Sequence, residues 1–488
     1  MDKKSINILI IGAGLAGELL YKNIKDDKES AFNVVGFIDD AKNKKNAKIG
    51  SVKVLGKIED IGGIAKEHKV KEIIIAIPSE RGETIRRVVQ YSMGLGLTYK
   101  ILPRISEVLL QDYDKDYLRY VRRIKAEDLL GGEILKSDQE GIEKNLKNEV
   151  VLITGAAGSI GSELSRQVTA YGAKKVIFYD WWENGMYDLE MYIKENYPER
   201  NCEFIIGDIK DKKKLDAVMK HFKPTTIFHA AAYKHVPLME SNVSEAVKNN
   251  ILGTKIVAET AIKNKVSKFV LISTDKAVNP TNVMGATKRA AEKVINILSK
   301  SQNKTIFFAV RFGNVINSNG SAIPLFERQI ETGGPVTVTH KEVTRFFMTI
   351  SEAVHLILQA WSMGKNNDLF VLDMGEPVKI YELANMLITL HGYVPGKDIK
   401  IKIIGLRPGE KLYEEVLVEQ EETSSTSVKK VFRTKNYLSF DRLVFLSNLS
   451  IIKEVIEEDG MNRTDLKEIL QIMISTYNPQ NETKILTS

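Results

Sequence analysis

The chain has 488 residues and carries 70 Lys and Arg against 63 Asp and Glu, a net charge of +7. Its length predicts two or three domains, and a hydrophobic fraction of 43% is that of a globular protein. Cys202 is the only cysteine, which excludes an intrachain disulfide and favours a reducing compartment. No apolar run reaches about 18 residues, so no transmembrane helix is predicted.

The basic residues are scattered, and no basic segment interleaved with aromatic residues accompanies them. We therefore interpret the excess positive charge as solvated surface and predict no nucleic-acid site. A mild preference for anionic ligands or for an anionic membrane surface stays open. No metal site is predicted.

The first predicted unit, residues 1–124, alternates strands with helical stretches, as parallel α/β sheets do. Its strands are expected at 6–11, 33–38 and 72–77, and the glycines after the first are Gly12, Gly14 and Gly17. Asp39 and Asp40 follow the second strand, which is the nucleotide-binding pattern, although a lone fingerprint is a weak signal. We expect a Rossmann-like domain that is either a regulatory nucleotide site or a spacer or oligomerisation domain with a vestigial loop.

Residues 125–148 are predicted to form a connector, 149–430 a catalytic domain and 431–488 a C-terminal helical extension. Strands of the catalytic domain are expected at 150–154, 175–179, 203–206, 226–230, 269–273 and 307–310. Their regular alternation with helical stretches predicts a second doubly wound parallel sheet, so the fold class is α/β with two Rossmann-like domains. The pattern breaks after Arg311, as expected of a small substrate-binding lobe.

A glycine-rich turn follows the first strand of the second unit. Its residues are Gly155, Gly158, Ser159, Ile160 and Gly161. Such a turn lets a pyrophosphate approach the backbone at the start of a helix. Asp180 ends the next strand, where a carboxylate would bond the adenine ribose and repel a 2′-phosphate, which favours NAD over NADP. The alternative for Asp180 is a capping residue on a turn.

Weaker signals follow each later strand in the order that a dinucleotide site requires. These further candidates for cofactor binding are Asp208, Ile209, Ala230, Ala231, Ala232 and Asn250. Asp208 and Ile209 would pass beside the adenine, and the alanines are small where the cofactor must approach the backbone. The order and spacing of these residues together are a strong signal.

Residues 150 to about 430 resemble the extended short-chain dehydrogenases that act as nucleotide-sugar 4,6-dehydratases, in particular the polysaccharide-biosynthesis group that dehydrates UDP-N-acetylglucosamine. The motifs that carry the resemblance are TGAAGSIG at 154–161, AAAYKHVP at 230–237, STDKAVNPTNVMGATK at 273–288, RFGNV at 311–315, GSAIP at 320–324, TRFFMT at 344–349 and RPGEK at 407–411. The whole chain looks like the large form of this family, which usually carries transmembrane helices ahead of its first domain. We expect a cytoplasmic protein, or one at the cytoplasmic face of the inner membrane if such helices have been removed.

The resemblance implies that NAD takes a hydride from C4 of the sugar and returns it to C6 after water has left across C5 and C6. It places Lys288 on the nicotinamide ribose, while Met284 occupies the position of the usual Tyr and cannot take a proton. We predict that Thr274 bonds O4, with help from Asp275 or water. Asp275 is then expected to be the acid at O6, and Lys276 the base at C5.

These roles demand a protonated Asp275 and a partly neutral Lys276, both of which burial favours. An ion pair between the two would oppose both shifts. Because successive residues of an extended segment point to opposite sides, we expect the two side chains to avoid each other. The alternative is a solvent-exposed Asp-Lys turn without a catalytic role.

The resemblance also implies a set of substrate-binding residues. Those expected near the UDP or sugar are Lys234, His235, Asn314, Ser321, Arg345, Arg407 and Glu410. An arginine forks naturally onto a pair of pyrophosphate oxygens. For His235, a core or surface role is as strongly indicated as a ligand role.

The sequence thus predicts an NAD-dependent UDP-N-acetylglucosamine 4,6-dehydratase that retains the C5 configuration, serves glycan assembly and forms a homo-oligomer. One alternative is a UDP-sugar 4-epimerase, although epimerases normally use the Tyr that Met284 replaces. Another is a catalytically silent nucleotide-sugar sensor or scaffold. The loss of Tyr favours this last hypothesis, and the retention of Thr274, Asp275, Lys276 and Lys288 opposes it.

Overall fold

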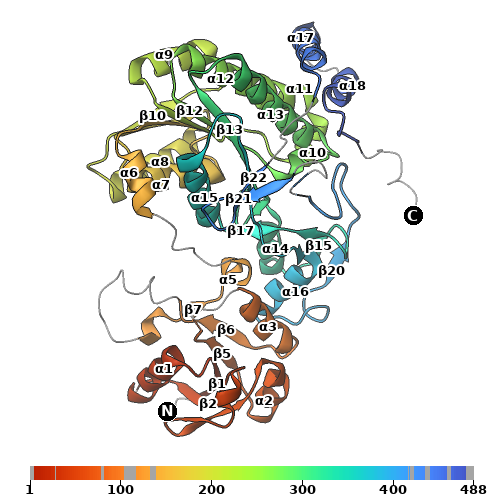
Figure 1. Cartoon of the computed structure of the whole chain (residues 1–488). Helices are drawn as coiled ribbons and strands as arrows, with labels where there is room; N and C mark the ends of the chain where they lie inside the picture. Colours follow the sequence, from red (N-terminus) through yellow and green to blue (C-terminus); the bar gives the residue numbers. More distant parts are fainter. Residues whose placement is uncertain are drawn as a thin grey trace. The chain divides into compact units, whose positions relative to one another are not determined.

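The computed structural model describes residues 5–27, 29–77, 82–103, 117–131, 139–415, 417, 422–434, 440–458 and 463–479 (Figure 1). Contacts between Cα atoms group the chain into two compact units. The first unit comprises Met1–Glu133, Gly320–Glu342 and Val378–Ile404, and the second Ile134–Asn319, Val343–Pro377 and Gly405–Ser488. The domain boundaries drawn from the sequence stay a prediction, and residues 132–138 of the expected connector lie outside the described residues.

The first unit is built on a seven-stranded sheet of order β3-β4-β2-β1-β5-β6-β7. Its strands are β1 (Ile6–Ile11), β2 (Phe32–Ile38), β3 (Lys48–Ile49), β4 (Val52–Gly56), β5 (Glu72–Ile75), β6 (Thr98–Ile101) and β7 (Arg122–Arg123). Only the edge strands β3 and β7 are antiparallel to their neighbours. Residues 8–11 of the central strand β1 are apolar and fully buried, as expected of a parallel strand covered on both faces.

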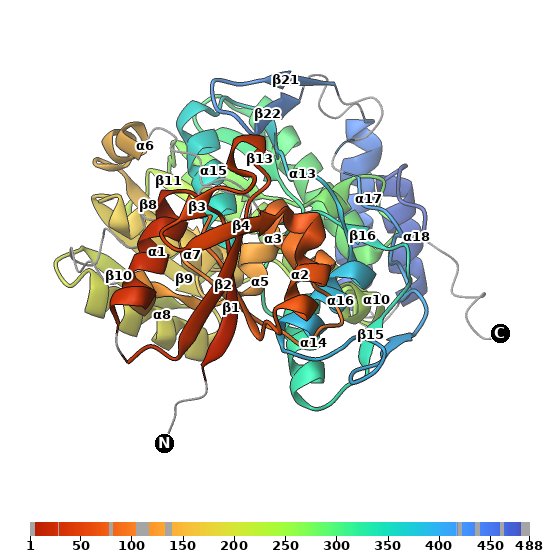
Figure 2. The same ribbon diagram turned by 90° about the horizontal axis from the view of Figure 1, so that it is seen from below.

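Helices cover both faces of this sheet. They are α1 (Leu15–Asp26), α2 (Ile61–Glu67), α3 (Gly82–Tyr91) and α5 (Ala126–Leu130). Figure 2 shows α1 on one side of β1 and β2 and α2 on the other, as right-handed crossovers in opposite directions require. The unit also contains elements from later in the chain: α14 (Ala322–Glu331), β15 (Val336–Val338), α16 (Ile380–Leu390) and β20 (Ile401–Ile403).

The second unit contains a nine-stranded sheet of order β10-β9-β8-β11-β12-β13-β18-β22-β21. Its strands are β8 (Val150–Thr154), β9 (Lys175–Asp180), β10 (Cys202–Ile206), β11 (Thr226–His229), β12 (Lys268–Ile272), β13 (Ile306–Arg311), β18 (Leu369–Leu372), β21 (Thr423–Ser425) and β22 (Val431–Thr434). The strands from β10 to β18 are parallel, whereas β22 and β21 are antiparallel additions. The order reverses between β8 and β11, and ligands of such sheets bind beyond the carboxyl ends of the strands at this point.

Two layers of helices sandwich the second sheet (Figure 1). One contains α6 (Gln139–Leu146), α7 (Ser159–Ala170), α8 (Glu183–Asn196) and α15 (Ile350–Met363), and the other α9 (Lys212–Phe222), α12 (Thr254–Lys263) and α13 (Val283–Ser301). The predicted α/β class with two Rossmann-like sheets is confirmed. The helical periodicity near the C-terminus corresponds to α17 (Arg442–Glu458) and α18 (Arg463–Met473), which pack on α13. Residues 431–434, assigned to the extension from the sequence, form β22 of the sheet.

Among the described helices, none is both long and apolar enough to cross a membrane. Within the same residues, no three His, Cys, Asp or Glu side chains gather in a way that could hold a metal ion.

Candidate active site

The glycine turn of the second unit joins β8 to α7. Gly155 has a φ of +71°, and a Cβ atom there would lie 2.5 Å from the backbone nitrogen of Ala231. A Cβ on Gly161 would lie 1.8 Å from the carbonyl oxygen of Gly155. Both positions therefore demand glycine, the first for the turn and the second for the close packing of helix on strand. Gly158 precedes α7, and Ser159 and Ile160 open the helix.

Asp180 ends β9 next to this turn. Its Oδ2 accepts a hydrogen bond of 3.0 Å from the backbone N–H of Ala157, and its Oδ1 accepts one of 3.0 Å from Trp182. The carboxylate therefore caps the turn, which is the alternative that the sequence left open. Each carboxylate oxygen has a second lone pair, so a ribose hydroxyl can still donate to it.

The other cofactor candidates line the carboxyl edge of the same sheet. Asp208 and Ile209 follow β10; Asp208 forms an ion pair of 2.8 Å with Lys210, while Ile209 is buried. The alanines at 230–232 follow β11. Asn250 lies in the π-helical segment Val247–Gly253, where its amide bonds the backbone of Tyr233 and the hydroxyl of Thr287. Asn250 thus ties the segment after β11 to α13, and the edge as a whole can hold a dinucleotide.

Met284 and Lys288 lie one turn apart on α13, and both are buried. The Nζ of Lys288 donates a hydrogen bond of 2.7 Å to the carbonyl oxygen of Ile272, the last residue of β12. Burial lowers the pKa of Lys288 to about 8. The helix is held against the sheet by Glu292, which accepts hydrogen bonds from Ser273 and from two nitrogens of Arg311.

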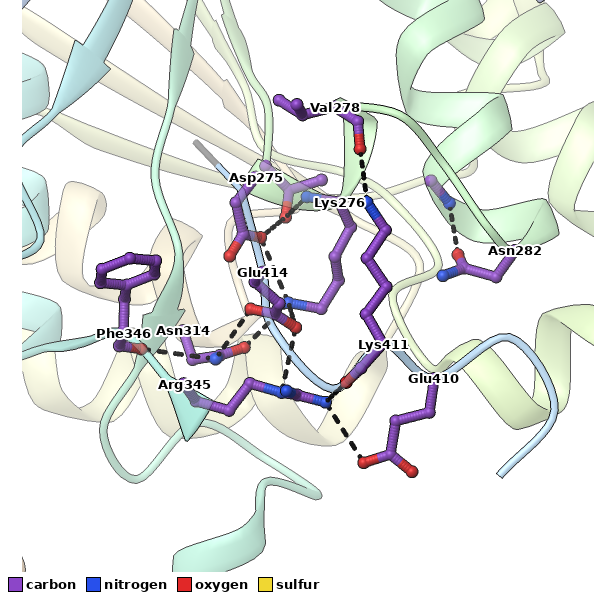
Figure 3. Close-up of polar contacts among 12 residues, drawn as sticks. Asp275, Lys276, Val278, Asn282, Asn314, Arg345, Phe346, Glu410, Lys411 and Glu414 are labelled. Atoms are coloured by element: carbon purple, nitrogen blue, oxygen red, sulfur yellow. Dashed lines mark hydrogen bonds and ion pairs between the residues drawn. The ribbon is translucent and has the colours of Figure 1, made fainter. Parts of the chain in front are cut away.

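A buried polar group, which we name the Asp275 cluster, gathers where β12 ends (Figure 3). Its members are Asp275, Lys276, Asn314, Arg345 and Glu414. The Nζ of Lys276 lies 3.2 Å from Asp275 Oδ1, 2.9 Å from Glu414 Oε1 and 2.9 Å from Asn314 Oδ1. Thr274 donates its hydroxyl to Asp275 Oδ1 at 2.9 Å. The lysine is therefore shared between two carboxylates.

The expectation that Asp275 and Lys276 avoid each other is wrong. Residues Asp275–Ala277 form a 3₁₀ turn capped by Thr274, so neighbouring side chains do not alternate as they would on a strand. Burial alone would lower the pKa of Lys276, but the charges of Asp275 and Glu414 outweigh it and raise that pKa above its usual value. The expected neutral lysine is therefore not found in this arrangement.

The pKa of Asp275, by contrast, moves in the direction expected from the sequence. Burial is the largest cause, the negative charge of Glu414 adds to it, and the pKa rises to about 7 although Lys276 and Thr274 oppose the shift. Asp275 therefore holds its proton near neutral pH, which an acid in catalysis needs.

Comparison with known proteins gives the family. Residues 151–436 match the family described as polysaccharide biosynthesis protein, and residues 1–102 match that described as CoA-binding domain. The chain belongs to the polysaccharide biosynthesis protein family. It is 44% identical over 477 residues to the capsular polysaccharide biosynthesis protein CapD of Staphylococcus aureus, covering 97% of this chain and 77% of CapD. It is 32% identical over 349 residues to the UDP-glucose 4-epimerase of Rickettsia canadensis, covering 69% of this chain and 98% of that protein.

Solved structures of related proteins agree with the fold. Pen from Bacillus thuringiensis is 36% identical with a TM-score of 0.56, covering 60% of this chain and 90% of Pen. DesIV of Streptomyces venezuelae, a dTDP-glucose 4,6-dehydratase with NAD and TYD bound, is 21% identical with a TM-score of 0.50, covering 55% and 88% of the two chains. The likeness to DesIV concerns the fold alone, and it shows that this fold binds NAD in a structural relative.

The residues that were predicted to bind the substrate do not all lie in one part of the structure. Asn314 and Arg345 belong to the Asp275 cluster, and Glu410 accepts a hydrogen bond of 3.2 Å from Arg345. Arg407, Lys234 and His235 are exposed. Ser321 precedes α14 in the first unit, so the structure gives no geometry for it relative to the other residues.

Arg345 is more firmly held than a pyrophosphate ligand would need to be. Its Nε lies 3.1 Å from Glu414, one terminal nitrogen donates to the carbonyl oxygens of Thr344 and Leu412, and the other donates to Glu410 and to the carbonyl oxygen of Lys411. A guanidinium has five donors, and here five acceptors of the protein surround it. Arg345 therefore anchors the segment 410–414, and its predicted contact with a pyrophosphate stays a prediction.

Glu414 is the member of the cluster that the sequence analysis missed. Burial alone would raise its pKa, but the charge of Lys276, the hydrogen bond with Asp275 and the charge of Arg345 lower it to about 2. The only signal in the sequence was an acidic pair, Glu414 and Glu415, three residues after the RPGEK motif. Nothing in that spacing indicates which of the two is buried beside Asp275.

Proposed function

We propose that the chain is an NAD-dependent UDP-N-acetylglucosamine 4,6-dehydratase that makes a UDP-2-acetamido-2,6-dideoxy-hexos-4-ulose with retained C5 configuration. The observation that carries the proposal is the buried carboxyl group of Asp275, whose pKa of about 7 lets it keep a proton near neutral pH. It follows β12, the fourth strand after the glycine turn. Loss of water from a sugar needs such an acid, whereas a simple hydride transfer does not.

The residues present fit NAD. Between β8 and the start of α7 the turn contains only glycine and alanine, and Asp180 lies at the end of the neighbouring strand. NAD, when bound, would accept a hydride from C4 of the sugar and return it to C6. Lys288, fixed to the end of β12, is positioned to hold the nicotinamide ribose in place.

The Asp275 cluster accounts for the movement of protons. Thr274 can turn its hydroxyl from Asp275 to O4 of the sugar and accept the O4 proton while it passes its own proton to water, so that O4 becomes the ketone oxygen as the hydride leaves C4. Asp275 can protonate O6 as the hydroxyl leaves. Lys276 can remove the proton from C5 only after it has lost its own proton to water, while Glu414, at 2.9 Å, stays ionised. Met284 has no proton to exchange, so its part is to fill space beside Lys288.

We also propose that Lys234, His235, Asn314, Ser321, Arg407 and Glu410 bind the UDP-sugar. The positive charges of Lys234 and Lys276 repel each other, and a bound pyrophosphate would relieve this repulsion. A homo-oligomer, a cytoplasmic location and a regulatory nucleotide site in the first unit complete the proposal.

A UDP-sugar 4-epimerase is the second candidate, and the identity to the Rickettsia canadensis protein favours it. Both reactions release a proton from O4, which Met284 cannot take, so Met284 does not separate the two candidates. Epimerases have no use for an acid at O6. The Asp275 cluster therefore favours dehydration.

The test is incubation of the purified protein with UDP-N-acetylglucosamine, without added cofactor, followed by mass spectrometry and NMR. Loss of one water with a new C6 methyl group is expected, together with solvent deuterium at C5 in deuterated water. An isomer of unchanged mass would establish the epimerase. No reaction with or without added NAD would overturn the proposal for this substrate.

A further inference from the structure

The Asp275 cluster contains two buried carboxyl groups, those of Asp275 and Glu414. The side chain of Asp275 is fully buried and that of Glu414 is 6% exposed, and the Nζ of Lys276 lies within 3.2 Å of both carboxyl groups. Two carboxylates in contact and out of water cannot both be ionised without a large repulsion, so one of them keeps a proton. The function of the site depends on which one.

The surroundings favour ionised Glu414. Lys276 lies 2.9 Å and Arg345 3.1 Å from its Oε1, and Asn314 donates to its Oε2 at 3.3 Å. Asp275 receives the same lysine at 3.2 Å and the Thr274 hydroxyl, both on Oδ1. Its Oδ2 is buried with no hydrogen-bond partner, which would be costly for a charged oxygen and suits a protonated carboxyl group.

We propose that Glu414 is a positioning residue whose buried negative charge, held by Arg345 and Lys276, keeps the proton on Asp275 that the departing C6 hydroxyl of the sugar needs. This inference rests on the proposed dehydratase function for the use of the proton, but the placing of the proton can be tested without substrate. The charged groups that face Asp275 and Glu414 are Lys276 on the 3₁₀ turn and Arg345 on β16 (Thr344–Arg345), with Lys234 acting on Lys276 from the segment after β11.

The first experiment is infrared spectroscopy of the whole 488-residue chain, titrated with pH. A protonated buried carboxyl gives its own C=O band, which is expected to disappear with a midpoint near 7 and to be absent in Asp275→Asn. In Glu414→Gln, loss of the neighbouring charge should move the midpoint down by about one pH unit or more. A midpoint that does not move would overturn the proposal, as would a wild-type band that vanishes near the ordinary pKa of aspartate.

Glu415→Gln is the matched control. It removes a carboxylate from the adjacent position, but Glu415 is half exposed and bonds Asn279 and Lys411 instead of the cluster. Its titration should follow the wild type. Glu414→Asp keeps the charge on a shorter side chain and should restore part of the shift, which a purely structural role for Glu414 would not predict.

The second experiment is the pH dependence of kcat. Asp275 must be protonated, so activity is lost as pH rises through its pKa. In Glu414→Gln, kcat should fall about tenfold near pH 8 for each unit by which that pKa drops, and should change little near pH 5. An equal loss at every pH would identify Glu414 as merely structural. If the band shifts as expected but UDP-N-acetylglucosamine is not dehydrated, the proton placement stands and the proposed function fails.

Discussion

The two glycine turns of this chain share one backbone design. A Cβ on Gly17 would lie 2.0 Å from the carbonyl oxygen of Gly12, and a Cβ on Gly161 would lie 1.8 Å from that of Gly155. In each unit an Asp at or just after the end of the next strand accepts a backbone N–H of the turn, that of Ala13 at 2.8 Å for Asp39 and that of Ala157 at 3.0 Å for Asp180.

The difference lies in what surrounds each turn. Asp39 forms an ion pair of 2.9 Å with Lys44, whereas the hydrogen bonds of Asp180 come from backbone N–H groups. In the second unit the Asp275 cluster lies just beyond the end of β12. Among the described residues of the first unit, no comparable buried group of carboxylates and lysine follows β5 or β6. The fingerprint therefore specifies a turn, and the chemistry comes from residues at the ends of other strands.

The largest effect on bound NAD is expected from removing the third glycine of the second turn. Gly161→Ala places a Cβ atom against the carbonyl of Gly155, and such overpacking costs about 1–3 kcal/mol or more. The variant should lose at least about nine-tenths of its bound NAD and its activity. Gly17→Ala should suffer a similar clash but keep its NAD. Nucleotide released on denaturation, measured by chromatography, checks both. NAD lost from Gly17→Ala instead would place the cofactor in the first unit.

The second prediction concerns the buried ion pair between Glu292 and Arg311. Glu292 is fully buried with Arg311 and Arg289, so Glu292→Gln should cost about 3–5 kcal/mol of the free energy of unfolding. Burial alone would raise the pKa of Glu292, but Arg311 outweighs it and lowers the pKa to about 2. The stability that this ionised group contributes is present above its unfolded pKa of 4.5 and is lost as pH falls from there through about 2. Chemical denaturation across this range would show the loss in the wild type and not in the variant.

The substitution Met284→Ala tests whether this residue takes part in the reaction or only in the packing of the fold. The side chain is buried among apolar neighbours of α13 and the C-terminal helices, so Met284→Ala should destabilise the fold by about 2–5 kcal/mol. Because a thioether exchanges no proton, substantial activity should remain at a temperature where the variant is folded. A complete loss of activity with unchanged circular dichroism would contradict this view of Met284.

The sequence predicted the sheets well and the cluster only in part. The parallel strands read as apolar runs, so their observed ends lie close to the predicted ones, as for β8 and β1. Thr274, Asp275 and Lys276 were found because they are adjacent in a motif. Glu414 and Arg345 approach them from segments far along the chain, and no local pattern encodes such a meeting. The 3₁₀ turn at Asp275 was missed because a strand was assumed to continue in extended form.

The smallest effect is expected at Lys44, and it bears on the purpose of the first turn. The Lys44–Asp39 pair is partly exposed, so Lys44→Ala should change the free energy of unfolding by no more than about 1 kcal/mol. Lys44 lies on the turn Lys42–Lys44, and its Nζ is near the start of α1, 3.8 Å from where a Cβ on Gly14 would be. A positive charge at a helix N-terminus attracts anions, so the same variant should weaken any nucleotide bound there and make binding less sensitive to salt.

Calorimetry in the Gly161→Ala background isolates the first turn, because the second can then no longer compete for ligand. Titration with NAD and with UDP-sugars should give a signal that Lys44→Ala reduces if the first unit is a regulatory nucleotide site. If neither NAD nor a UDP-sugar gives a heat of binding, the first unit would have the spacer or oligomerisation role. It would also show that a complete glycine turn with its capping Asp can persist for the packing of helix on strand alone, since the clash at Gly17 constrains that position whether or not a nucleotide binds.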